Sequence, residues 1–83
     1  MTSLCAPQRP PLYAVDGTPL AQLTFEQVSF PGCPYVAYAG GVEVWITHQN
    51  GRRALLWWGD DEQPTEHPTV VEAMKAADRR LNA

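Results

Sequence analysis

Two glycine-containing turns divide residues 35–58 into three short segments, and this pattern constrains the fold more than any other part of the chain. Gly40-Gly41 follows the first segment, and Asn50-Gly51 separates residues 42–49, which alternate apolar and polar, from the third. Asn-Gly between alternating segments is a strong hairpin signal, because both central residues of a type I′ turn need positive φ. The pattern predicts an antiparallel meander of three strands.

The lengths of the two turns set the expected register, and the register decides which side chains share a face. Two-residue turns predict the cross-strand pairs Ala39–Val42, Ala37–Val44, Val36–Trp45, Gln49–Arg52, Trp45–Leu56 and Val44–Trp57. In this register an apolar inner face includes Val42, Val44, Ile46, Leu55 and Trp57. A three-residue loop with a bulge at Gly51 would instead slide the last strand by one residue. Trp57 and Trp58 would then exchange faces.

The last segment of the chain predicts a helix over about 69–81. Thr69 and Glu72 have the spacing of a capping box, in which Thr69 is the N-cap. Apolar residues then recur at helical spacing on one stripe, formed by Val70, Ala73, Met74, Ala77 and Leu81. We therefore expect a single α+β domain, in which a three- to five-stranded antiparallel sheet packs its inner face against one C-terminal helix.

The remaining segments are less regular. Residues 1–11 contain three prolines and predict a flexible tail, so that the domain covers residues 12–83. A short edge strand is expected at 12–15, and residues 20–30 allow either a strand over 20–26, which we favour, or one to two helical turns. Residues 60–66 hold four carboxylates and one proline, which predicts a solvated loop.

Composition excludes several classes of protein. Apolar residues make up 45% of the chain and charged residues 18%, as in globular proteins. The formal net charge of -3 gives no general attraction to nucleic acid, but it suits a basic protein partner. Cys5 and Cys33 lack the spacing of a disulfide scaffold or zinc site. With no signal peptide and no apolar run of about 20 residues, we expect a cytoplasmic protein that does not enter the membrane.

No motif indicates catalysis, a metal or a cofactor. Nothing in the sequence connects Cys33 to either histidine, His48 or His67, as a nucleophile and base would require. His67 beside the acidic loop has the ligand types of a metal site but no spacing that fixes a geometry. Residues 10–13, Pro-Pro-Leu-Tyr, match the Pro-Pro-x-Tyr peptide that WW domains bind in polyproline II form. The same residues could simply lead the chain into the sheet.

The face of the sheet opposite the helix, called the outer face, is the strongest candidate for function. The expected register places Tyr38, Trp45, Leu56 and Trp58 on it. Residues 12–30, a second copy of the chain, or a partner would have to cover these side chains. Aromatic residues are enriched at the centres of protein interfaces.

We therefore expect a small non-catalytic binding module or inhibitor that docks on a larger protein. The acidic residues Asp60, Asp61 and Glu62 could imitate phosphate toward a nucleic-acid-handling partner. Small inhibitors encoded by phages and mobile elements, including those that act on CRISPR systems, share this profile of size and acidity. The alternative is a nucleic-acid-binding module that uses Arg52 and Arg53 at the hairpin tip beside Trp45 and Trp58.

Overall fold

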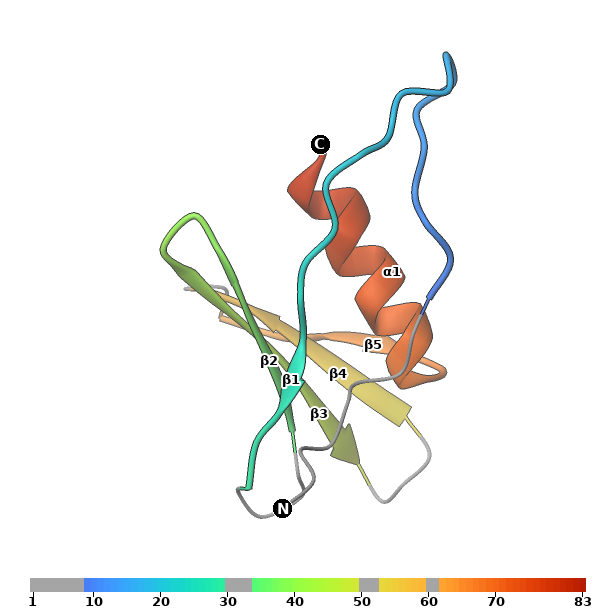
Figure 1. Ribbon diagram of the computed structural model, residues 1–83. Coiled ribbons are helices and arrows are strands. Elements are labelled where there is room, and N and C mark those ends of the chain that lie inside the picture. Colours follow the sequence, from blue (N-terminus) through green and yellow to red (C-terminus); the bar gives the residue numbers. More distant parts are fainter. Residues whose placement is uncertain (1–8, 30–33, 50–52, 60–61) are drawn as a thin grey trace, which may run out of the picture.

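The computed structural model describes residues 9–29, 34–49, 53–59 and 62–83. Within them, one antiparallel sheet has the strand order β1-β2-β3-β4-β5, and a helix lies against one of its faces (Figure 1). The predicted single small α+β domain is confirmed. The elements are β1 (Glu26–Gln27), β2 (Tyr35–Ala39), β3 (Val42–Gln49), β4 (Arg53–Trp58), β5 (Thr65–His67) and α1 (Val70–Leu81).

The β2–β3 hairpin forms as predicted. Gly40 and Gly41 have φ angles of 57° and 86°, which suit the two central positions of a type I′ turn. Glycine adopts these angles without the steric cost that a Cβ would bring. The turn sets Ala39 opposite Val42, and the pairing continues to Tyr35 opposite Ile46.

The register predicted for β3 and β4 is wrong by one residue. Gln49 pairs with Arg53, so three residues connect the strands; these residues, 50–52, and the predicted φ angles of Asn50 and Gly51 lie outside the described part of the chain. The observed register places Ala54, which is 1% exposed, on the inner face and Arg53 on the outer face. The predicted register would have turned the Arg53 charge toward the core, at a large desolvation cost.

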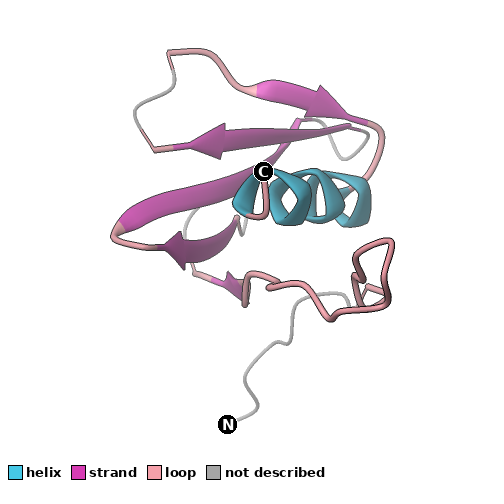
Figure 2. Ribbon diagram, turned by 90° about the horizontal axis from the view of Figure 1, so that it is seen from above, coloured by secondary structure: helices cyan, strands magenta, loops and turns pink. Residues whose placement is uncertain are grey.

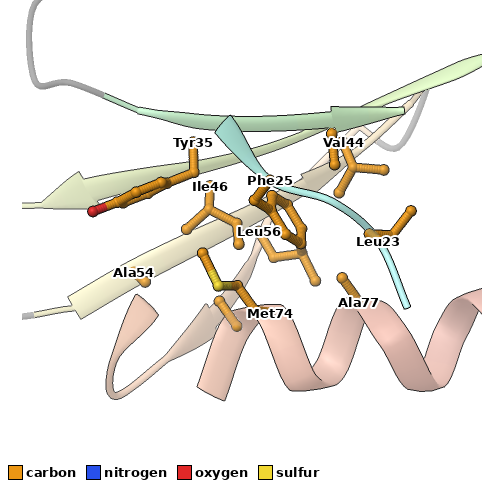
Figure 3. Packing of buried hydrophobic residues seen from close by; sticks show 11 residues of the cluster. Leu23, Phe25, Tyr35, Val44, Ile46, Ala54, Leu56, Met74 and Ala77 are labelled. Carbon is orange, nitrogen blue, oxygen red and sulfur yellow. The ribbon is translucent and has the colours of Figure 1, made fainter. Parts of the chain in front are cut away.

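The core lies between the sheet and α1, and Figure 3 shows its side chains pointing toward one another. Ala73, Met74 and Ala77 from the predicted helical stripe are fully buried. In the sheet, Leu56 takes the inner position that was predicted for Leu55, as the slipped register requires. The complete cluster is Leu23, Phe25, Tyr35, Ala37, Val44, Ile46, Ala54, Leu56, Ala73, Met74 and Ala77.

Most of the N-terminal segment is irregular, contrary to the strand favoured at 20–26. Only Glu26 and Gln27 pair with β2, and the strand expected at 12–15 is reduced to one bridge, between Tyr13 and Pro19. The loop that contains this bridge extends past the C-terminal end of α1 (Figure 1). Figure 2 shows this loop beside the helix, so the backbone of the loop approaches α1 and not the sheet.

Side chains of the helix replace the missing strand partners of this segment. The Asn82 side chain bonds to both the N–H and the carbonyl of Ala21, at 3.2 and 2.7 Å. One turn earlier, the Asp78 carboxylate accepts the Leu23 N–H at 3.0 Å. These bonds satisfy backbone groups that a β-ladder would otherwise satisfy, and they allow Leu23 and Phe25 to enter the core.

Arg9 forms a buried ion pair with Asp78, although its position fell within the predicted tail. Its guanidinium donates to both carboxylate oxygens, from Nε at 2.5 Å and from Nη2 at 2.8 Å, and also to the Leu23 carbonyl. The same guanidinium lies 5.4 Å from the centroid of the Phe25 ring. Asp78 is only 1% exposed. Arg9 therefore connects the start of the described chain to the final helix.

The two edge strands of the sheet are short. β1 has two residues, and β5 has three, which pair with Ala54, Leu55 and Leu56 of β4. Residues 60–66 were predicted to form a loop, but Thr65 and Glu66 belong to β5. Pro64 and Pro68 flank this strand and leave too few residues for an alternating pattern to be visible in the sequence.

We expect Thr69→Ala to lower the free energy of unfolding by about 0.5–2 kcal/mol. Thr69 is the observed N-cap, and its Oγ1 accepts the Glu72 N–H at 3.1 Å. Alanine removes this acceptor, whereas Thr69→Ser keeps it and serves as the control. Urea unfolding of the three proteins measures the difference. Equal stability of the alanine and serine variants would show that the cap contributes nothing.

Candidate binding surface

The outer face is the surface of the sheet that points away from α1. Because side chains alternate along each strand, the observed register determines its members. They come from all five strands and combine aromatic, aliphatic and charged side chains. The members are Glu26, Val36, Tyr38, Glu43, Trp45, Thr47, Arg53, Leu55, Trp57 and Glu66.

An aromatic cluster occupies the middle strands of this face. Trp45 of β3 lies directly opposite Trp57 of β4. The Trp57 indole N–H donates to Thr47 Oγ1, and the Trp45 indole N–H donates to Glu43 Oε1, each at 3.0 Å. Trp57 is 37% exposed and Tyr38, on β2, is 68% exposed. The indole donors are thus satisfied within the protein, while ring surface of Trp57 and Tyr38 remains available for contact.

The charged side chains on the outer face are mostly acidic. Glu26 and Glu43 are exposed, and Glu66 forms an ion pair with Arg53 at 2.7 Å. Both members of that pair are at least half exposed, so the bond adds little stability. Among the described residues, the outer face therefore holds three carboxylates and one guanidinium. This balance attracts cations and repels phosphate.

Residues 12–29, in the described N-terminal segment, leave Tyr38 and Trp57 on the outer face exposed, whereas Val36, opposite β1, is only 6% exposed. Leu23 and Phe25 pack on the opposite side of the sheet, and Ala21 is bonded to the helix through Asn82. Figure 1 shows the segment running along α1 until it reaches β1. For the exposed rings of the outer face, the described residues therefore leave a second copy of the chain or a partner as the cover.

The structure separates the residues predicted for this site into three groups. Tyr38 and Trp45 lie on the outer face as expected, and Glu62 is exposed beyond β4; Arg53 also lies on the outer face, although the predicted register placed it on the inner one. Arg52, Asp60 and Asp61 lie outside the described residues. The placement of Leu56 and Trp58 on the outer face is wrong, because the slipped register turns both toward α1.

Leu55 and Trp57 take the places of those two residues on the outer face. Their neighbours in the chain explain the exchange: Leu56 is 6% exposed in the core, and the Trp58 ring packs against the Arg80 guanidinium at 4.8 Å. The alternative of a three-residue loop, which the sequence also allows, predicts this exchange of faces. With Leu-Leu-Trp-Trp in succession, both faces receive one leucine and one tryptophan in either register.

A groove of about 520 Å³ adjoins the outer face at β2. It lies between residues 22–24 and the end of β2, because β1 pairs with only the first two residues of that strand. Tyr38 and Val36 line it from the sheet, and Leu81 lines it from the helix. Glu26 is the one carboxylate among its lining residues. The groove therefore extends the apolar and acidic surface and offers no nucleophile paired with a base.

The titratable groups of the described chain form no reactive cluster. The pKa of Asp16 lies below its ordinary value, mainly because its carboxylate accepts the Thr18 backbone N–H at 3.0 Å. This bond belongs to the turn at the tip of the projecting loop. His67 lies in β5, with its Nε2 2.8 Å from Thr65 Oγ1. No group of three metal-ligating side chains occurs among the described residues, and no described helix could span a membrane.

Comparisons of the chain with protein-family models, with curated proteins and with solved structures find no match. The surface chemistry of the fold is therefore the basis on which a function can be proposed.

Proposed function

We propose that this protein is a small non-catalytic binding module that docks through its outer face on a larger, basic protein. The observation that carries the proposal is the pair of exposed rings of Tyr38 and Trp57, which lie beside the half-buried Trp45 on the outer face. A module of this size would act by occupying a surface of its partner, as an inhibitor does.

The chemistry of the face selects the kind of partner. Lysine and arginine side chains stack on the faces of tryptophan and tyrosine, and they form charge-assisted bonds with carboxylates. Glu43 and Glu26 supply such carboxylates beside the aromatic rings. Basic surfaces are typical of nucleic-acid-handling proteins, so a partner from such a complex fits best. Inhibitors of host defence, including inhibitors of CRISPR complexes, belong to this functional class.

A nucleic-acid-binding role is the alternative, and the described charges favour it less. Arg53 would have to contact phosphate, but its guanidinium is already bonded to Glu66. Base stacking on Trp57 would also bring phosphates close to the carboxylates of the same face. The two roles differ in their dependence on charge, and therefore a single set of variants can distinguish them.

The experiment compares wild-type protein with Trp57→Ala and Tyr38→Ala in affinity capture from the native host, followed by mass spectrometry. Both side chains are exposed, so circular dichroism should show intact folds. Tyr13→Ala is the matched control, because Tyr13 is 57% exposed but lies in the loop beside α1. We expect a protein that the wild type and the control capture and that both outer-face variants lose.

Binding of that protein in purified form gives the quantitative test. We expect either outer-face substitution to weaken binding by about 2 kcal/mol, or roughly 30-fold. Glu43→Gln should slow association and reduce its sensitivity to salt. Capture that is equal for all variants would contradict the proposal. Binding to single-stranded DNA or RNA that Arg53→Ala abolishes would support the alternative instead.

A further inference from the structure

Residues 10–13 combine a restricted backbone with exposed rings. The rings of Pro10 and Pro11 fix φ in both residues, and a following proline disfavours helical geometry at Arg9 and Pro10. Covalent structure alone therefore favours the polyproline II conformation at the start of this segment. Recognition of such a segment by aromatic-lined grooves requires no refolding of the ligand.

The exposure of the four residues matches the Pro-Pro-x-Tyr pattern. Pro10, Pro11 and Tyr13 are exposed, whereas Leu12, at the position where the motif accepts any residue, is half-buried. The Tyr13 ring is not part of the hydrophobic core, and 57% of the residue is exposed. The fold thus partly buries Leu12, which recognition does not need, and leaves the two prolines and Tyr13 accessible.

Three contacts hold the segment in place. The Gln22 side-chain amide donates to the Pro10 carbonyl at 2.9 Å, and the Leu20 N–H donates to the Leu12 carbonyl at 2.8 Å. The preceding residue, Arg9, is held by Asp78. A segment that is ordered before binding loses less conformational entropy than a free peptide does. We therefore expect the motif to bind more tightly within the folded chain than as an isolated peptide.

We propose that residues 10–13 are a ligand for a WW domain. The two prolines would contact the aromatic groove of the domain, and Tyr13 would fill the adjacent pocket. The segment lies beside α1, on the opposite side of the sheet from the outer face (Figure 2). The proposal is therefore independent of the function proposed for the outer face, and both partners could bind together.

The test is a fluorescence-anisotropy titration of the full chain with a purified WW domain of the Pro-Pro-x-Tyr-binding class. We expect saturable binding by the wild type, and binding at least about tenfold weaker for Tyr13→Ala and for Pro11→Ala. Val15→Ala is the control within the same loop, because Val15 is fully exposed but lies outside the motif. Trp57→Ala is the control for the outer face. Both controls should bind as the wild type does.

Circular dichroism and thermal unfolding of each variant separate loss of the motif from loss of the fold. Since Tyr13 lies outside the core, its substitution should leave the melting curve nearly unchanged. An absence of binding by the wild type, or equal binding by wild type and a folded Tyr13→Ala variant, would overturn the proposal. A titration with an SH3 domain, which reads a different proline pattern, should show no binding.

Discussion

Replacement of Asp78 by alanine is expected to destabilise the fold by about 3–5 kcal/mol, because it leaves the Arg9 guanidinium uncompensated in a buried site. The Arg9 side chain is only 10% exposed. Removal of the carboxylate also takes an acceptor from the Leu23 N–H and from the Gln22 side chain. Urea unfolding monitored by tryptophan fluorescence measures the loss.

Two further variants show whether the ion pair is the cause. Asp16→Ala removes an exposed carboxylate, which accepts the Thr18 N–H in the projecting loop, and should lower stability much less than Asp78→Ala does. Arg9→Met combined with Asp78→Ala removes the stranded charge, so the double variant should be more stable than Asp78→Ala alone. If Asp78→Ala were no more destabilising than Asp16→Ala, the pair would not hold the N-terminal segment.

Met74→Ala is expected to lower the free energy of unfolding by about 2–5 kcal/mol. Met74 is fully buried at the centre of the core, and the Phe25 and Ile46 side chains lie close to it in Figure 3. Alanine would leave a cavity that the sheet and the helix cannot both move to fill. Met74→Leu keeps nearly the same volume and should cost less than about 1.5 kcal/mol. Similar losses for the two variants would show that packing at this position is loose.

The elements that could be predicted from the sequence are those specified by neighbouring residues. Gly40-Gly41 sets the register of one hairpin by itself, and the stripe through Met74 identifies the buried side of α1. The β3–β4 register was missed because Leu55 to Trp58 are all apolar and satisfy either face equally. Only the contrast between Arg53 and Ala54 indicates the correct register, in which the charge is exposed and the alanine is buried.

The contacts that could not be predicted join distant parts of the chain. Arg9 and Asp78 are separated by 69 positions, and nothing near Arg9 indicates a buried partner. Asp78 follows Ala77 on the apolar stripe, where a lone carboxylate is the single local sign of a buried ion pair. The candidate binding surface shares this limit. Tyr38 and Trp45 were placed on the correct face of the sheet, but Leu55 and Trp57, two of the five apolar members of the outer face, depended on the register.

The short edges of the sheet have a consequence for self-association. Growth of a sheet by strand addition needs a row of free N–H groups, and proline cannot donate one. β5 ends between Pro64 and Pro68, and β1 offers only two residues. Each described edge strand therefore offers only a short row of N–H groups to amyloid-like stacking. The molecule can thus present tryptophan and tyrosine rings to a partner through side chains, while its short edge strands limit the recruitment of further copies through the backbone.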